Sequence, residues 1–302
     1  MTLVFIVGAT ATGKSDLAVT LAEQLKGEVV NADSMQLYRG MDIGTAKLSI
    51  QDRRGVVHHL IDVLEVTQDS SVAQYQTMAR AKIDELQRAN TPVIVVGGTG
   101  LYVKAILDDL NFPERDPEIR ERLQLESEAI GAIALHERLA KLDPAAAAAI
   151  PAQNVRRVVR ALEVIEITGK PFTANLPREA STRYPAAKQF GLVMDRENLD
   201  ERISKRVEGM WKSGFVDEVK GLVEIGLREG KTAQAALGYS QILQFLDGEI
   251  SEATAKDETK RATRQYARRQ ETWFSRDGRI TWLKGDLSDR LEKITSTIIS
   301  DR

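Results

Sequence analysis

Apolar residues follow two alternating patterns along the first third of the chain. Short runs rich in β-branched residues alternate with longer segments in which apolar residues recur every three to four positions. The runs predict strands, and the periodic segments predict helices at about 14–26 and 71–90. The expected strands are Leu3–Val7, Glu28–Ala32, Val57–Val63 and Pro92–Val96. This alternation is typical of a parallel sheet with helices on both faces.

The pattern changes at about residue 113, and no strand is expected between 116 and 170. Asp116–Pro117 and Asp143–Pro144 each combine an N-cap residue with a proline at the first helical position. Gln153–Thr168 is amphipathic, and Gly169 follows it as a helix stop. We therefore expect residues 114–187 to form an all-helical insertion.

The strand pattern returns after the insertion. Residues 189–195 and 279–283 predict two further strands, with helices at about 199–212, 214–227, 231–246 and 251–274. The expected organisation is an α/β core formed by residues 1–113 and 188–302, interrupted by the helical insertion at 114–187.

Composition narrows the class of protein. The 302 residues are 42% hydrophobic and 28% charged with a net charge of −2, which is typical of a soluble globular protein. The absence of cysteine excludes disulfides and cysteine-based zinc sites. Neither a basic leader nor an apolar run of membrane-spanning length is found, so a cytoplasmic location is expected. A monomer is the default expectation. Any contact with nucleic acid has to come from local basic patches.

The first strand leads into a phosphate-binding motif. Gly8, Gly13, Lys14 and Ser15 match G-x-x-x-x-G-K-[ST] between an apolar run and a helical pattern. The glycines let backbone N–H groups approach phosphate oxygens, Lys14 supplies a charge, and Ser15 offers a hydroxyl to Mg²⁺. A glycine-rich turn without a ligand is the alternative. The motif predicts a P-loop NTPase-like core that binds a di- or triphosphate.

Polar residues follow the other predicted strands. Asp33 and Ser34 come at the carboxyl end of the second strand, where open α/β sheets bind ligands. Asp33 could be a metal-bound acid, a catalytic base or a loop cap. Asp62 ends the run HHLID, which fits either a Walker B acid on Mg²⁺ or any buried strand that ends in a loop. Its part in Mg²⁺ binding is left open.

The segment GGTG at 97–100 directly follows the fourth strand. Its glycines suit close approach of the backbone to a ligand, and Thr99 could bind a phosphate oxygen or orient a neighbouring acid. A plain turn from strand to helix is the alternative.

Basic residues gather in several places. Arg156, Arg157 and Arg160 share one polar helix face, and Arg206 lies in a second group with Arg202 and Lys205. The densest group lies in the last long helix, where Arg261, Arg264 and Arg268 share a face and aromatic residues are interspersed. Solvated charged faces are the usual alternative. Together the groups favour a polyanionic partner such as RNA.

Two other functions start from the same loop. A small-molecule or nucleoside kinase explains the phosphate loop and Asp62, but it leaves the basic groups and the insertion without a role. An RNA-binding protein whose loop only senses a nucleotide explains the basic groups, but it needs no reactive acid at Asp33.

The motifs together resemble one family, the tRNA dimethylallyltransferases. GATATGKS, NADSMQLYRGMDIGTAK, HHLID, PVIVVGGTGLYVKA, RISKRVEGMWKSGFVDEV and TRQYARRQETWF occur in the family's order over nearly the whole chain. Departures are small: Ala9 replaces a usual proline, Ser240 a usual lysine, and Arg268 a common lysine. Without cysteine for a zinc finger, the chain is similar to the bacterial form.

The resemblance implies transfer of a dimethylallyl group from dimethylallyl diphosphate to an exocyclic amine (N6) in tRNA. The acceptor would be the adenosine immediately 3′ of the anticodon in tRNAs that read codons beginning with U. Asp33 would be the general base, Thr99 would bind near it, and Arg206 would clamp the diphosphate.

The resemblance also implies binding roles. The diphosphate would lie, with Mg²⁺ on Ser15, against Gly8, Ala9, Thr10, Ala11, Thr12, Gly13, Lys14 and Ser15. Residues expected to contact tRNA are Ser34, Met35, Gln36, Arg120, Arg156, Arg157, Arg160, Arg261, Arg264 and Arg268.

Overall fold

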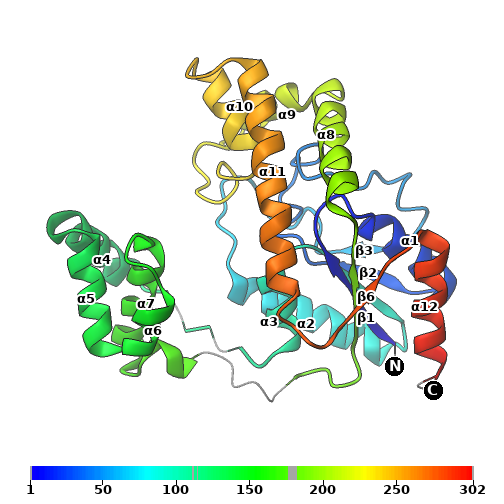
Figure 1. The fold of residues 1–302 in the computed structure, drawn as a ribbon, viewed down its shortest axis with the longest axis horizontal. Helices are drawn as coiled ribbons and strands as arrows, with labels where there is room; N and C mark the ends of the chain where they lie inside the picture. The colour runs from blue at the N-terminus through cyan, green and yellow to red at the C-terminus, as the bar shows by residue number, and fades with distance from the viewer. Residues whose placement is uncertain (1, 111, 114, 176–181, 301–302) are drawn as a thin grey trace. The chain divides into compact units, whose positions relative to one another are not determined.

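The computed structural model describes residues 2–110, 112–113, 115–175 and 182–300 (Figure 1). These residues divide into two compact units. One unit combines Met1–Ile106 with Tyr184–Arg302, and the other consists of Leu107–Arg183. The first unit is therefore built from chain segments that precede and follow the second.

A six-stranded parallel sheet forms the centre of the first unit. Its order is β3-β2-β4-β1-β5-β6, so β1 lies between β4 and β5. The strands are β1 (Leu3–Gly8), β2 (Glu28–Asn31), β3 (His58–His59), β4 (Val93–Val96), β5 (Lys188–Leu192) and β6 (Ile280–Leu283). Every residue of β1 is buried, as its continuous apolar run requires of a central parallel strand. The predicted α/β class and parallel sheet are confirmed.

The third expected strand is much shorter than Val57–Val63. Only His58–His59 pairs with β2. Leu60 and Asp62 adopt positive φ angles of 59° and 57°, which an extended strand excludes. The side-chain amide of Asn31 binds the Leu60 carbonyl at 2.9 Å in place of a strand partner. A run of apolar residues ending in an acid is therefore a loop here.

Helices make up the rest of the regular structure described in the first unit. They are α1 (Lys14–Leu25), α2 (Val72–Arg88), α3 (Gly100–Leu107), α8 (Arg196–Lys212), α9 (Phe215–Glu224), α10 (Tyr239–Leu246), α11 (Glu252–Phe274) and α12 (Leu287–Ser300). Side chains of β1 that alternate along the strand, Val4 and Ile6, join α1 and α12 in one core cluster. In Figure 1, α8 and α11 run side by side, and the two helices are in contact.

Two helical expectations need correction. The helix expected at 231–246 begins only at Tyr239, because Gly238 has a φ angle of 88° that interrupts helical backbone. Helix α12 was not expected, although Arg290, Ile294 and Ile298 are buried at helical spacing.

The second unit is helical. It contains α4 (Pro117–Ile130), α5 (Ala132–Leu142), α6 (Pro144–Ala149), α7 (Val155–Thr168) and the 3₁₀ helix η1 (Phe172–Asn175). Asp116 and Asp143 cap α4 and α6 through side-chain oxygens, as their sequences predict. The unit has a core of its own, which includes Leu123, Leu135 and Leu162.

In the part of the chain that the structure describes, none of the helices combines the length and apolar character needed to cross a bilayer.

Candidate active site

The phosphate loop connects β1 to α1. Gly8 has a φ angle of 134°, and a Cβ atom there would lie 3.0 Å from the carbonyl oxygen of Leu192 in β5. Gly13 has a φ angle of 92° directly before α1. Both glycines are therefore required by backbone geometry, and the loop delivers Lys14 and Ser15 to the N-terminus of α1.

Side chains of the loop bind the loop's own backbone. The Thr12 hydroxyl donates to the Ala9 carbonyl at 2.8 Å, and Thr12 is buried. The Lys14 ammonium donates to the same carbonyl at 2.7 Å. If Lys14 binds an anion, its ammonium group either leaves the Ala9 carbonyl or donates to both. The Thr12 hydroxyl bond to the same carbonyl can hold the turn in either case.

One backbone N–H of the loop is bound by a side chain that the sequence did not suggest. The Thr10 N–H donates to Gln270 Oε1 at 2.8 Å, and Gln270 Nε2 donates to the Gly98 carbonyl at 2.9 Å. Gln270 is buried and comes from α11. It links the phosphate loop to the turn after β4, and the only sequence signal is its helical spacing from buried Ala267 and Phe274.

Asp33 lies just beyond the carboxyl end of β2. Its backbone N–H donates to Asn31 Oδ1 at 3.0 Å, and its carboxylate oxygen Oδ1 accepts the Met35 N–H at 2.9 Å. The carboxylate therefore caps the turn that follows. Capping leaves room for acid–base chemistry. The Met35 N–H binds Oδ1 and thereby orients the carboxylate, so that Oδ2 can still accept a proton.

Thr99 contacts the residue after Asp33. Its hydroxyl oxygen accepts the Ser34 N–H at 3.1 Å and donates to the Ser34 hydroxyl at 3.3 Å. The Tyr266 side chain also interacts with Thr99, and burial together with the nearby Asp33 charge raises the pKa of Tyr266. Thr99, Ser34 and Asp33 thus belong to one polar cluster.

The glycines around Thr99 make close contacts within the protein itself. A Cβ atom on Gly97 would lie 2.2 Å from the Ala32 backbone. At Gly98 it would lie 2.1 Å from Gln270 Nε2, and at Gly100 2.1 Å from Trp273 Cδ1. These glycines admit neighbouring protein atoms, so close approach to a ligand is not needed to explain them.

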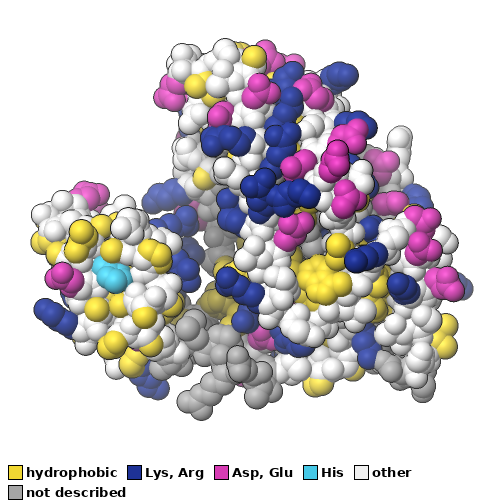
Figure 2. All heavy atoms as spheres, viewed as in Figure 1, with side chains coloured by type: hydrophobic (Ala, Val, Ile, Leu, Met, Phe, Trp, Pro, Cys, Tyr) yellow, Lys and Arg dark blue, Asp and Glu magenta, His cyan; other side chains and the backbone are white. Residues whose placement is uncertain are grey.

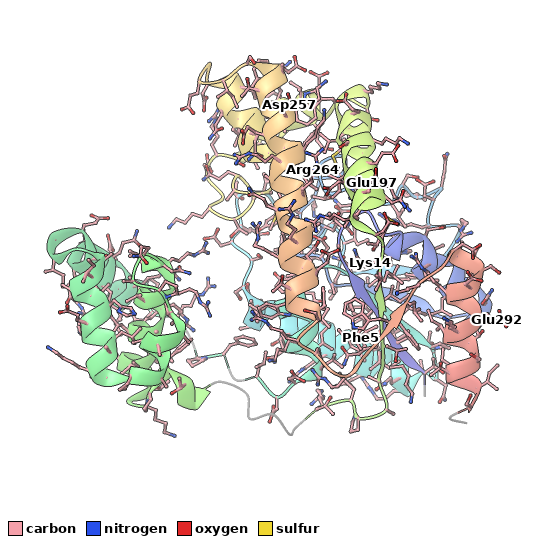
Figure 3. All side chains as sticks on the ribbon, in the orientation of Figure 1. Phe5, Lys14, Glu197, Asp257, Arg264 and Glu292 are labelled. Atoms are coloured by element: carbon pink, nitrogen blue, oxygen red, sulfur yellow. The ribbon has the colours of Figure 1, made fainter. Side chains whose placement is uncertain are left out.

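Two cations and one carboxylate dominate the electrostatics. Burial and the nearby Arg206 lower the pKa of Lys14 to about 8, while Asp33 acts to raise it. Burial also lowers the pKa of Arg206, and Asp33 again opposes the shift. Figure 3 labels Lys14 at the start of α1. Lys14, Arg206 and Asp33 are thus close enough to interact, and a multivalent anion would relieve the repulsion between the cations.

One backbone carbonyl, that of Thr45, connects Arg206 to the segment that follows Asp33. Arg206 Nη2 donates to the Thr45 carbonyl at 3.4 Å, and Gln36 Nε2 donates to it at 3.2 Å. Met35 packs against the apolar cluster that includes Tyr239. Ser34, Met35 and Gln36 are all half-buried.

Asp62 has a cationic partner. Lys47 Nζ lies 2.6 Å from Asp62 Oδ1 and 2.6 Å from Asp42 Oδ1, and the Lys47 side chain is 3% exposed. A buried ammonium thus binds one oxygen of this carboxylate in the loop.

The basic residues of α11 differ in their surroundings. Arg264 is half-buried and donates to the Ser204 hydroxyl of α8 at 2.8 Å. Arg261 is exposed and pairs with Glu258, and Arg268 is exposed. Figure 2 shows Lys and Arg side chains gathered along α11, and Figure 3 labels Arg264 among them.

The second unit has its own basic cluster. Arg120, Arg160 and Arg156 all act to lower the pKa of Arg115, after its burial, so these four cations are close together. Arg160 is partly neutralised by Glu163 at 2.9 Å. Arg157 is exposed on the same helix. Arg115 is the member that the sequence did not single out.

Comparison with known proteins identifies the family. A model of the IPP transferase family matches residues 36–277. A curated tRNA dimethylallyltransferase of Thermobifida fusca is 58% identical over 297 residues, which cover 97% of this chain and 92% of that protein. A curated tRNA dimethylallyltransferase of Streptomyces griseus is 57% identical over 290 residues, covering 96% and 92% of the two chains.

Solved structures agree with the sequence relatives. A tRNA isopentenylpyrophosphate transferase of Bacillus halodurans has a TM-score of 0.72 at 40% identity, covering 99% of this chain and 96% of that one. A eukaryotic dimethylallyltransferase acting on tRNA has a TM-score of 0.85 at 27% identity, covering 100% and 80%. With the P-loop-like fold and the match over most of its length, this chain belongs to the IPP transferase family, the tRNA dimethylallyltransferases.

Proposed function

We propose that this protein transfers the dimethylallyl group of dimethylallyl diphosphate to N6 of the adenosine 3′-adjacent to the anticodon. The substrates would be tRNAs that read codons beginning with U. The observation that carries this proposal is the mutual proximity of Lys14, Arg206 and Asp33. It combines an anion site and a carboxylate in a chain whose close relatives are named for this reaction.

The cations would act on the leaving group. As the C–O bond of dimethylallyl diphosphate breaks, its electron pair stays on the diphosphate, whose negative charge rises. Lys14, Arg206 and free N–H groups at the start of α1 would stabilise that charge more in the transition state than in the ground state. One such donor typically contributes about 3–4 kcal/mol.

Asp33 would act on the nucleophile. The exocyclic amine of adenine forms the new C–N bond and has to lose a proton, which the Asp33 carboxylate would accept. A positioned carboxylate typically contributes about 10²–10⁴-fold in rate. The Met35 N–H bond to Oδ1 would orient the other oxygen for this transfer.

Mg²⁺ fits this site in one particular way. Among the residues that the structure describes, no group of three His, Asp or Glu side chains could hold a metal. Mg²⁺ commonly takes most of its ligands from phosphates and water. We infer that Ser15 would hold the ion together with diphosphate oxygens, and that the ion would supply further neutralisation of the leaving group.

The tRNA would bind through the basic clusters. A stacked adenine cannot enter a protein site, so the base has to leave the stack, which is least costly in a loop. Ser34, Met35 and Gln36, beside Asp33, would hold the displaced base. Contacts to the tRNA backbone would come from two sets: Arg261, Arg264 and Arg268 on α11, and Arg120, Arg156, Arg157 and Arg160 in the second unit. Because free tRNA is the proposed substrate, we propose a cytoplasmic location, with a monomer as the default state.

The test is a reconstituted reaction. Protein, Mg²⁺, dimethylallyl diphosphate and unmodified tRNA are incubated, and mass spectrometry of nuclease fragments locates any added prenyl group. We expect it on the adenosine 3′-adjacent to the anticodon. Phosphate transfer from ATP to a nucleoside without prenylation would instead identify a kinase.

Asp33→Asn tests the base. Asparagine keeps an oxygen for the Met35 N–H and removes the proton acceptor, so turnover should fall by about 10²–10⁴-fold. Binding of tRNA should stay within about threefold. Asp16→Asn, on the exposed start of α1, is the matched control and should keep full turnover. Unchanged turnover in Asp33→Asn would show that Asp33 is not the base.

A further inference from the structure

Glu218, on α9, binds a turn that is more than 170 residues away in sequence. Its Oε2 accepts the backbone N–H groups of Asp42 at 3.1 Å and Ile43 at 2.7 Å. Its Oε1 accepts the Gly44 N–H at 3.3 Å and the Tyr239 hydroxyl at 2.6 Å. Every group that the structure places against this carboxylate is a donor.

The same turn is enclosed by aromatic side chains. A Cβ atom on Gly44 would lie 2.3 Å from Phe215 Cζ and 2.4 Å from Tyr239 Cε2. The rings of Phe215 and Tyr239 are 4.9 Å apart in an edge-to-face arrangement. Tyr239 is fully buried. The turn at 42–44 is therefore held by hydrogen bonds on one side and by packing on another.

The residue after this turn contacts the anion site. The Thr45 carbonyl accepts hydrogen bonds from Arg206 at 3.4 Å and from Gln36 at 3.2 Å. Its position depends on the turn, because Thr45 directly follows the three N–H groups bound by Glu218.

We propose that Glu218 is a positioning residue that fixes the turn at 42–44, and through the Thr45 carbonyl fixes the Arg206 guanidinium where it binds diphosphate. The inference rests on the proposed function for the identity of the anion. It adds a residue that acts through the backbone and not by touching a substrate.

The donor pattern gives the inference a sharp test. In Glu218→Gln, one carboxylate oxygen becomes an NH₂ group, which has the same shape but opposes at least one N–H or O–H donor. Glutamine should therefore fail although it preserves the packing. Tyr239→Phe removes one donor only and should have a smaller effect in the same direction.

The measurement is calorimetric binding of inorganic diphosphate with Mg²⁺, together with steady-state kinetics. Glu218→Gln should weaken diphosphate binding about tenfold or more and raise KM for dimethylallyl diphosphate. The Kd for tRNA should stay within about twofold. The control is Asp217→Asn, whose side chain is 80% exposed and pairs only at the surface with Lys220; it should match the wild type.

Two results would overturn the inference. One is wild-type diphosphate affinity in Glu218→Gln; the other, if that variant does not fold, is wild-type affinity in Tyr239→Phe. A purely structural role would lower the melting temperature without changing affinity measured well below it. Absence of prenyl transfer by the wild type would contradict the proposed function instead, so the two failures are distinguishable.

Discussion

Lys14 illustrates how a single residue is tuned by its surroundings. Its ammonium group donates to the Ala9 carbonyl, and burial together with Arg206 brings its pKa to about 8. An ordinary lysine would stay charged well above that value. The charge that would attract diphosphate is therefore lost within an accessible pH range.

This pKa predicts a pH dependence of diphosphate binding. If the protonated form of Lys14 binds the anion as proposed, affinity should be full at pH 7 and should fall as the pH rises through about 8. Calorimetry between pH 7 and 9.5 measures the fall. Lys14→Gln is the reference, because it shares the ionisation of the ligand and lacks the lysine.

Comparison with Lys14→Gln also defines the result that would contradict the prediction. The affinity of Lys14→Gln should be lower than that of the wild type at pH 7, and the two should converge above pH 8. Parallel curves over the whole range would show that Lys14 does not titrate there.

At the residue scale, local motifs point to candidate residues for the chemistry but not to the residues that hold them in place. The phosphate-loop residues are candidates because spacing and strand context define their motif, whereas local sequence leaves Asp33 open between acid, base and cap. Gln270 and Glu218 have no such motif, since each acts on a segment far away in sequence. A glutamine or a glutamate within a helix carries no local sign of such a partner.

Helix α12 is an element that, like Gln270 and Glu218, acts on segments far away in sequence. Its Arg290 guanidinium donates to the Thr12 carbonyl at 3.1 Å and to the Val193 carbonyl at 3.2 Å. Arg290 is buried. The helix therefore ties the phosphate loop to the segment after β5.

Arg290→Met should destabilise the first unit. The substitution leaves two carbonyl groups without this donor, at a cost of about 1–3 kcal/mol. Urea denaturation of the variant measures the loss of unfolding free energy. Glu292→Gln, exposed on the same helix and labelled in Figure 3, is the control and should change stability little.

A wild-type midpoint in Arg290→Met would show that water replaces the guanidinium at no cost. A loss in Glu292→Gln as large as that in Arg290→Met would instead assign the effect to the helix as a whole.

Element boundaries depended on backbone conformations that the hydrophobic pattern does not encode. The run at Val57–Val63 has strand composition, yet positive φ angles at Leu60 and Asp62 end the strand after His59. The α10 helix starts eight residues later than its pattern suggested, at Tyr239 instead of 231, because Gly238 precedes it in a positive φ conformation.

At the scale of the whole molecule, the sequence separates an α/β core from a helical insertion. The structure has two compact units, of which the second has an apolar core of its own. This division suggests that RNA binding and anion binding can be altered independently.

A double variant of the second unit tests that independence. Arg120→Ala with Arg156→Ala should weaken tRNA binding and reduce the slope of log K against log salt by about one for each lost phosphate contact. Filter binding at several salt concentrations measures both effects. Diphosphate binding should be unchanged. Lys141→Ala, exposed on α5, is the control.

An unchanged salt slope in the double variant would remove the cluster around Arg115 from the tRNA interface. Weaker diphosphate binding in the same variant would show that the two functions are coupled.

The interruption of the sheet has a consequence for how the chain is made. β1 pairs with β5, and the register places Val4 beside Lys188. During translation, β1 has to wait for β5, which begins about 180 residues after β1 ends, and at typical rates of synthesis this takes about 10–40 s. The second unit is continuous in sequence and can fold as soon as it leaves the ribosome. Until β5 is synthesised, the buried edge of β1 is open, and this interval is when a chaperone would have most to protect.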